Sequence, residues 1–236
     1  MLQVNDVHYF YKTRYQKVEA LRGVNCTFHQ GKVYSITGKT KSGKTTLLNL
    51  LAGLDKPAHG SIQMDGVETP KINRSRFRRE HIAMVNQGLN LLPLLSVLEN
   101  IMYPMELNHI SKADAEKKAL NLLEQVELPA DYGRKLASKL SGDEQQRVAI
   151  ARALAMPGRI ILADEPTSNL NAVNTINVIN LFSELAYRQD YCVIIATQDD
   201  DITKRSDVVY ELKNGEIVTS GSSEGKISTG FEYSYT

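Results

Sequence analysis

Tryptophan is absent from the 236-residue sequence, cysteine occurs only twice, and no apolar run is long enough to cross a lipid bilayer. Because a spanning helix needs about 20 predominantly apolar residues, we expect any contact with a membrane to be made through a partner protein. The opening stretch MLQVNDVHYF has no basic segment followed by an apolar run, which argues against a secretory signal. Two cysteines do not suggest a disulfide framework, which favours a reducing compartment.

The sequence also lacks a large net charge and histidines at the spacing of a metal site. The 28 Lys and Arg against 27 Asp and Glu leave a formal net charge of +1, so no overall field attracts nucleic acid or an anionic lipid surface. We therefore expect no nucleic-acid partner. The five histidines are scattered without the spacing of a metal site. The one basic run, residues 71–79, is typical of a solvated helix or loop face, with a contact to a membrane protein or lipid headgroup as the alternative.

What the sequence does contain is an alternation of short strands and helices. Its 42% of hydrophobic residues suffices for a sizeable core, and the length suits one α/β domain with or without a subdomain. Residues 1–35 predict a mostly antiparallel β region. The β-branched run 33–37 predicts a buried strand that ends at Gly38, before a helix over 45–54. The remaining predicted elements are strands at 82–86, 160–163 and 193–197 and hairpins at Asp65-Gly66 and Asn214-Gly215.

A helical segment interrupts this pattern. Residues 88–140 read as helical, with a capping-box-like start at Ser111 and apolar residues at helical spacing after it. We predict a helical subdomain over 88–140, inserted into an α/β core of residues 1–87 and 141–218. The tail, residues 219–236, is rich in Ser and Gly and is predicted to be flexible. A later helix is expected to be capped by Asn171 and to carry one face made of Ala172, Ile176, Ile179 and Phe182.

The segment between the strand at 33–37 and the helix at 45–54 matches the phosphate-loop pattern G-x-x-x-x-G-K-[ST]. Its backbone N–H groups and the helix N-terminus would surround phosphate oxygens. Lys44 would reach the β- and γ-phosphates, and the Thr45 hydroxyl would bind Mg²⁺. The alternative, a glycine-rich turn with an incidental lysine, does not account for the flanking strand and helix. The segment comprises Gly38, Lys39, Thr40, Lys41, Ser42, Gly43, Lys44 and Thr45.

Two carboxylates, Asp164 and Glu165, directly follow the predicted strand at 160–163. Asp164 would hold Mg²⁺ through water, and Glu165 would polarise the attacking water as a general base. The alternative is an acidic cap on the following helix. A phosphate loop elsewhere in the chain favours the catalytic interpretation.

A third motif, LSGDEQQR over residues 140–147, makes the chain resemble the ATP-binding subunits of ABC transporters, whose signature is LSGGEQQR. The resemblance covers residues 1–218, and the sequence around the motifs is similar to that of the macrolide-exporter, lipoprotein-release and antimicrobial-peptide-export group. It implies a P-loop NTPase core, a mixed sheet with flanking helices. It also implies ATP and Mg²⁺ as ligands, a second ATP-binding subunit in a homo- or heterodimer, and a separate membrane permease that holds the chain at the cytoplasmic face of the cell membrane.

The same resemblance assigns further residues. Tyr11 would stack on adenine, with Tyr9 and Tyr15 as rivals, and the ATP-binding segment would extend to Thr46. Gln87 would contact Mg²⁺, take part in catalysis and link the core to the helical subdomain. A groove at 91–99 would receive the permease. The ATP of the partner subunit would be contacted by Ser141, Gly142, Asp143 and Glu144.

The signature also has a local interpretation, because Ser141 and Glu144 form an S-x-x-E capping box that starts a helix. The N-terminus of that helix would point at the γ-phosphate held by the partner subunit.

The chain departs from the family pattern at several positions. Lys41 replaces a glycine of the phosphate loop, and Asp143 replaces the second signature glycine, where a carboxylate would repel a nearby γ-phosphate. The segment 168–171, called the D-loop in the family, ends in Asn171 rather than Asp. Gln198 stands where the family has a catalytic histidine, and glutamine, unlike histidine, cannot take up a proton at neutral pH.

These departures leave two functions open, an ATPase motor that drives the permease and an ATP-gated clamp with slow or no turnover. A role in DNA repair or translation is disfavoured, because the sequence has neither a long coiled-coil insertion nor a second nucleotide domain.

Overall fold

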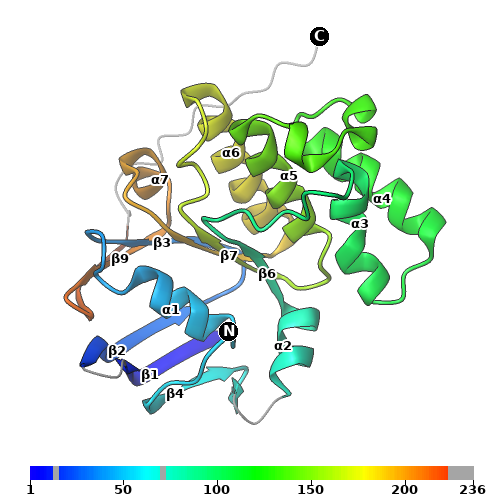
Figure 1. The fold of residues 1–236 in the computed structure, drawn as a ribbon. Helices are drawn as coiled ribbons and strands as arrows, with labels where there is room; N and C mark the ends of the chain where they lie inside the picture. Colours follow the sequence, from blue (N-terminus) through cyan, green and yellow to red (C-terminus); the bar gives the residue numbers. More distant parts are fainter. Residues whose placement is uncertain (13–15, 70–72, 223–236) are drawn as a thin grey trace.

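The computed structural model describes residues 1–12, 16–69 and 73–222, which fold into two sheets and two groups of helices (Figure 1). The larger sheet has the strand order β10-β9-β3-β8-β7-β6, and the smaller, antiparallel sheet has the order β2-β1-β4-β5. The larger sheet consists of β3 (Lys32–Thr37), β6 (Ile82–Val85), β7 (Ile160–Asp164), β8 (Cys192–Ala196), β9 (Val208–Lys213) and β10 (Glu216–Ser222). The smaller sheet consists of β1 (Leu2–Lys12), β2 (Lys17–Phe28), β4 (His59–Met64) and β5 (Val67–Glu68).

The central strands β3, β8, β7 and β6 are mutually parallel, and β9 continues parallel to β3. Every residue of β7 and β8 is buried, as expected for parallel strands covered on both faces. Only β10 runs antiparallel, as the second strand of the predicted hairpin at Asn214-Gly215. Because parallel strands share a direction, the loops that follow β3, β7 and β8 all emerge at one edge of the sheet.

Helices cover both faces of this sheet. In Figure 1, α1 (Lys44–Leu51) lies between the central sheet and the antiparallel sheet, whereas α5 (Gly142–Leu154) and α6 (Ala172–Gln189) lie on the opposite side. The core is divided accordingly into two clusters of buried side chains. Along β7, Ile160 and Leu162 belong to the α1 side, and Ile161 and Ala163 belong to the α5 and α6 side. This period of two directs Asp164 toward α1.

The helical subdomain begins later than predicted. Residues 89–96 are irregular, and the first helix is α3 (Val97–Leu107), which Ser96 and Glu99 start with a reciprocal capping box. The predicted start at Ser111 is confirmed for α4 (Lys112–Gln125), where the Ser111 hydroxyl accepts the Asp114 N–H. Both helices pack against α5, and two short 3-10 helices complete the group, η2 (Ala130–Arg134) and η3 (Ala137–Lys139). Among the described residues, no helix combines the length and apolarity needed to cross a bilayer.

The basic run agrees with the helix alternative of its prediction. Residues 74–79 belong to α2 (Arg74–His81) and Asn73 is its N-cap, whereas residues 71 and 72 lie outside the described part of the chain. The structure corrects details of two other predictions. On α6, Ile179 and Phe182 are buried as predicted, but Ala172 and Ile176 are exposed because the buried stripe follows a different register. The first residues of the predicted flexible tail pair with β9 as part of β10, which extends to Ser222, and residues 223–236 lie outside the described part. A last short helix is α7 (Asp200–Lys204).

The loop after β3 adopts conformations that restrict its sequence. Gly38 has φ of 144°, and a Cβ there would collide with the carbonyl oxygen of Leu212. Lys41 is a non-glycine residue in the left-handed region, with φ of 68°. Such a backbone costs a residue with a Cβ about 1–2 kcal/mol, so the loop carries strain at the position where the family resemblance leads one to expect glycine.

Lys41→Gly should therefore raise the free energy of unfolding, by about 0.5–1 kcal/mol, because relief of the left-handed strain exceeds the extra entropy of glycine in the unfolded chain. Lys39→Gly is the matched control, since it removes the same charge from the same exposed loop, but Lys39 is not among the residues with positive φ. The control should lose about 0.5–1 kcal/mol. Urea unfolding measures both, and equal losses in the two variants would contradict this account.

Candidate nucleotide-binding site

The loops at the carboxyl edge of the central sheet enclose a cleft of about 720 Å³. Most of the residues predicted to bind a nucleotide line it, together with six residues to which the sequence assigned no binding role, Val18, Glu19, Ala20, Arg22, Asn214 and Gly215. The first four carry no motif and reach the cleft through the pairing of β1 with β2, whereas Asn214 and Gly215 form the predicted hairpin turn after β9. The predicted residues in its lining are Tyr11, Thr40, Lys41, Ser42, Gly43, Lys44, Thr45, Thr46, Gln87, Asp164, Glu165 and Gln198.

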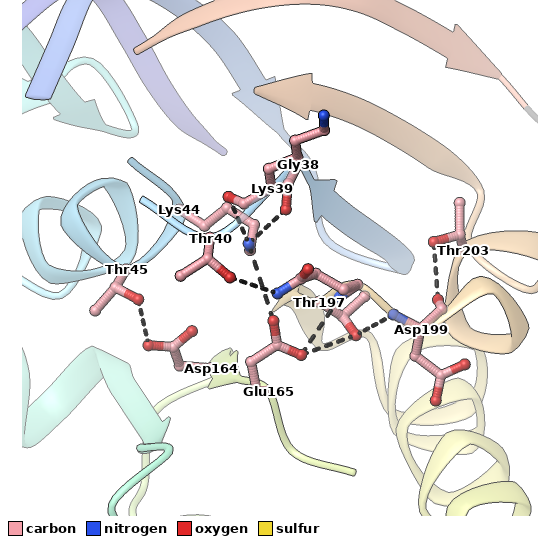
Figure 2. Close-up of polar contacts among 11 residues, drawn as sticks. Gly38, Lys39, Thr40, Lys44, Thr45, Asp164, Glu165, Thr197, Asp199 and Thr203 are labelled. Carbon is pink, nitrogen blue, oxygen red and sulfur yellow. Dashed lines mark hydrogen bonds and ion pairs between the residues drawn. The ribbon is translucent and has the colours of Figure 1, made fainter. Parts of the chain in front are cut away.

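Lys44 lies at the centre of the phosphate loop. Its ammonium donates hydrogen bonds to the carbonyl oxygens of Gly38, at 2.6 Å, and Lys39, at 3.4 Å. The Glu165 carboxylate lies 3.9 Å from the same nitrogen (Figure 2). Since Lys44 is only 6% exposed, its charge acts in a partly desolvated environment, where attraction to a phosphate is stronger than in water. Gly38 and Lys39 thus contribute through their carbonyl groups, which hold this ammonium, rather than by lining the cleft.

Thr45 and Asp164 form the part of the site that suits a metal ion. The Thr45 hydroxyl donates to the Asp164 carboxylate at 2.8 Å (Figure 2). Burial raises the pKa of Asp164, and this hydrogen bond and the Lys44 charge oppose that rise. No group of three or more His, Cys, Asp or Glu that could hold a metal occurs within the described residues. A hydroxyl, one carboxylate and the side-chain amide of Gln87 nevertheless fit Mg²⁺, which takes few protein ligands and completes its shell with phosphate oxygens and water.

The Glu165 carboxylate is held in place by the loop after β8. Its Oε2 atom accepts hydrogen bonds from the Thr197 hydroxyl and the Gln198 backbone N–H, each at 3.3 Å. Glu165 has φ of 47°, and its own N–H donates to the Ala196 carbonyl at 2.8 Å. A left-handed non-glycine residue persists only where surrounding contacts enforce it. The contacts therefore hold a carboxylate at the edge of the cleft, beside Lys44, where it can polarise a water molecule.

Gln198 reaches the opposite side of the cleft. Its amide nitrogen lies 3.5 Å from the Thr40 hydroxyl, a long hydrogen bond to the phosphate loop. The side chain is exposed and so is available to a ligand in the cleft. Glutamine at this position supplies hydrogen-bond donors and an acceptor but does not ionise near neutral pH.

Among the three candidate tyrosines, the geometry favours Tyr11 as the adenine contact. Tyr11 lines the cleft with 46% of its surface exposed, and its hydroxyl lies 3.0 Å from the Thr46 hydroxyl. Tyr9 packs edge-on against Tyr11 and donates its hydroxyl to Asp55, a hydrogen bond that raises the pKa of Tyr9 to about 12. Tyr15 lies outside the described residues. Tyr9 therefore packs against the Tyr11 ring, and its own hydroxyl is bound to Asp55.

The four signature residues do not line this cleft. The predicted capping box at Ser141 and Glu144 is present, and the Ser141 N–H that bonds the Glu144 carboxylate lowers the pKa of Glu144. Gly142 begins α5, and Asp143 follows it. An unpredicted contact joins α5 to the segment after Gln87, because the Arg152 guanidinium donates to the carbonyl groups of Leu89 and Asn90, both at 2.6 Å. Ser141 and Gly142 are exposed at this helix start, whereas Asp143 and Glu144 are half-buried.

Comparison with known proteins agrees with this geometry. The family described as "ABC transporter" matches residues 21–168. The ATP-binding protein LolD of a lipoprotein-releasing system in Legionella pneumophila (strain Paris) is 43% identical, over 85% of this chain and 89% of its own length. The ABC transporter ATP-binding protein MJ0796 of Methanocaldococcus jannaschii is 35% identical, over 92% and 95%.

Solved structures are equally similar. The dimeric structure of MJ0796 superimposes with a TM-score of 0.91 at 34% identity, covering 96% of this chain and 100% of that one. A second dimeric structure of MJ0796, in a post-hydrolysis state with ADP and Pi, matches to the same extent. CbiO1 of Clostridium perfringens, described as part of an ABC transporter complex, has a TM-score of 0.82 at 27% identity, over 94% and 88%. The chain therefore belongs to the ABC transporter family, as one of its ATP-binding and ATP-hydrolysing subunits.

Proposed function

We propose that this chain binds Mg·ATP in the cleft, pairs with a second ATP-binding subunit around the nucleotide, and uses hydrolysis to drive a separate membrane permease. The observation that carries the proposal is the arrangement of Lys44, Thr45, Asp164 and Glu165, which the loop after β3 and the end of β7 bring together at one edge of the sheet. An ammonium for the phosphates, a hydroxyl and a buried carboxylate for the metal, and a second carboxylate for the attacking water are the groups that phosphoryl transfer to water requires.

The chain's own residues have separable roles in this reaction. Lys44 attracts the β- and γ-phosphates, and the loop N–H groups at the start of α1 add the positive end of a helix dipole. Glu165 accepts a hydrogen bond from the attacking water and takes up its proton as the new P–O bond forms. The bond between the γ-phosphorus and the β–γ bridging oxygen breaks at the same time, which releases ADP and phosphate. Thr197 and the Gln198 backbone keep this carboxylate oriented. Mg²⁺, held by Thr45, Asp164 and Gln87, would neutralise charge on the phosphate oxygens.

The partner surfaces follow from what the fold leaves exposed. The signature at the start of α5 would contact the ATP of a second subunit, homologous or identical. On the helical subdomain, Leu94 is 86% exposed, next to a hollow of about 330 Å³ lined by Leu91, Pro93 and Ser138. A strongly exposed leucine beside a hollow of mixed polar and apolar lining suits a contact with another protein. We assign it to the permease, which would hold the chain at the cytoplasmic face of the membrane, as the relation to a lipoprotein-releasing system suggests.

A slowly cycling ATP-gated clamp is the second candidate, motivated by Asp143, Asn171 and Gln198. The support that Thr197 and Gln198 give to Glu165 favours the motor, because a carboxylate held in this way is of no use to a clamp. The two candidates differ in turnover. A motor should hydrolyse ATP at on the order of 1 per second or faster, as enzymes usually do.

Glu165→Gln should lower ATP turnover by about 100-fold or more, because it removes the base but keeps the shape and the hydrogen-bond acceptor. The affinity for Mg·ATP, measured by calorimetry, should be preserved. Glu184→Gln is the matched control, because Glu184 is an exposed residue of α6 that pairs with Arg188 away from the cleft, and its turnover should equal that of the wild type. Undiminished hydrolysis in the Glu165 variant would remove this residue from the role.

Tyr11→Ala should weaken Mg·ATP binding by about 5- to 150-fold, because one aromatic stack on a base contributes about 1–3 kcal/mol. Binding of inorganic triphosphate, which has no base, should not change. Tyr11→Phe should bind ATP nearly as well as the wild type, since it keeps the ring and loses only the Thr46 contact. Tyr103→Ala is the control, because that ring is 45% exposed on α3, away from the cleft. If Tyr11→Ala binds ATP normally, adenine stacks elsewhere.

Leu94→Asp should reduce the share of the chain that sediments with membranes of cells that also produce the permease, by about tenfold, as expected for a buried interface side chain. Leu120→Asp makes the same change at a residue of α4 that is 37% exposed, and it should leave sedimentation unchanged. Mg·ATP binding by both soluble variants should be normal. Equal sedimentation of the two variants would contradict the assignment of this surface.

A further inference from the structure

The Asp143 carboxylate is fully engaged within the chain. Its Oδ2 atom forms an ion pair with the Arg147 guanidinium at 3.0 Å, one turn later on α5. Its Oδ1 atom accepts a hydrogen bond at 2.7 Å from the side-chain amide of Asn174 on α6. The sequence suggested that this carboxylate would repel a γ-phosphate. The structure adds that Arg147 offsets this charge and that Asn174 binds the other oxygen.

Asn174 belongs to a second helix start. Its backbone N–H donates to the Asn171 side chain at 2.9 Å, which is the N-cap of α6. Asn171 is the last residue of the segment 168–171. The start of α5, with the signature, is therefore connected to the start of α6, with segment 168–171, by the chain of contacts Asp143–Asn174–Asn171. Two departures from the family pattern, at 143 and 171, meet on one asparagine.

The Arg147 guanidinium is itself fixed. It donates to the carbonyl groups of Glu127, at 2.8 Å, and Val126, at 3.3 Å, at the end of α4, and its side chain is 15% exposed. An ionised acceptor makes a hydrogen bond roughly twice as strong as a neutral one, and partial burial limits screening by salt. Asp143 thus anchors α6 to a charge that α4 and α5 already hold in place.

We propose that Asp143 is a positioning residue that, through Asn174, makes the signature at the start of α5 and segment 168–171 move as one unit. On the proposed function, on which this inference rests, the signature contacts the nucleotide of the second subunit, and Asn174 links segment 168–171 to it. The connection therefore governs ATP-driven pairing of subunits and leaves nucleotide binding to the phosphate loop of the same chain unaffected. In this chain, an aspartate at the second signature position would support pairing rather than oppose it.

Exchange of the two side-chain types tests the contact directly. Asn174→Asp sets two carboxylates against each other, whereas Asp143→Asn with Asn174→Asp reverses the hydrogen bond, since an amide at 143 can donate to position 174 and accept from Arg147. Asn177→Asp is the matched control. It lies one turn later on α6, and its amide binds the Glu127 carboxylate at 2.6 Å. The same substitution therefore creates the same kind of repulsion without touching Asp143, since Arg147 binds the backbone carbonyl of Glu127 and not its carboxylate.

The first readout is amide hydrogen exchange of the full chain without nucleotide, which requires no partner. Asn174→Asp should increase exchange about tenfold in both 141–147 and 168–176 and leave 38–45 unchanged, and the double variant should restore wild-type rates in both segments. Increased exchange confined to α6, or no restoration in the double variant, would overturn the proposal. Asn177→Asp should leave 141–147 unchanged.

The second readout is Mg·ATP-dependent dimerisation in the Glu165→Gln background, followed by sedimentation. Asn174→Asp should weaken it about tenfold and the double variant should recover it, while Mg·ADP affinity, which depends on the chain's own loop, stays constant in all variants. Normal dimerisation of Asn174→Asp would overturn the functional part of the inference. If the chain with intact Asn174 does not dimerise with Mg·ATP, the pairing of identical subunits fails instead. Hydrogen exchange then still decides whether the contact exists.

Discussion

The site depends on the order of three adjacent parallel strands. β3, β8 and β7 lie side by side in the sheet, so the loops that follow them open at the same edge. One loop carries Lys44, one carries Glu165 and one carries Gln198. The alternation of side chains along β7 then directs Asp164 toward Thr45 at the start of α1. The Lys44 ammonium and the Thr45 hydroxyl come from one segment, and the Asp164 and Glu165 carboxylates that face them come from another. Their distances therefore depend on the order of the strands that carry these segments.

Much of this was predictable because the signals are local. The run of β-branched residues before Gly38, the helix after the phosphate-loop pattern and the capping box at Ser141 depend on neighbours within a few residues, and the structure confirms these elements. The α6 face and the end of β10 were predicted less well. Ile176 is exposed although it is apolar, and Ser222 belongs to a strand although its surroundings are rich in Ser and Gly. Tertiary packing, rather than composition, decides such positions.

Contacts between distant segments were out of reach from the sequence. Arg152 binds carbonyl groups that are more than 60 residues away in the sequence, and Asn174 on α6 binds Asp143 on α5. Neither residue belongs to a motif with a spacing that predicts a contact. Lys41 is an intermediate case, because its difference from glycine is visible in the sequence but the left-handed backbone that makes it costly is visible only in the structure.

The central claim is that Thr45 and Asp164 hold a metal ion against a triphosphate bound by the loop around Lys44. Calorimetric titration of the wild type and Thr45→Val with ATP, with Mg²⁺ and with EDTA, tests this most directly. The account predicts one Mg·ATP bound per chain and tighter binding with Mg²⁺ than without it in the wild type. It also predicts that Thr45→Val loses the gain from Mg²⁺ while keeping the metal-free affinity. No uptake of Mg·ATP by the wild type, or an undiminished gain from Mg²⁺ in the variant, would contradict it.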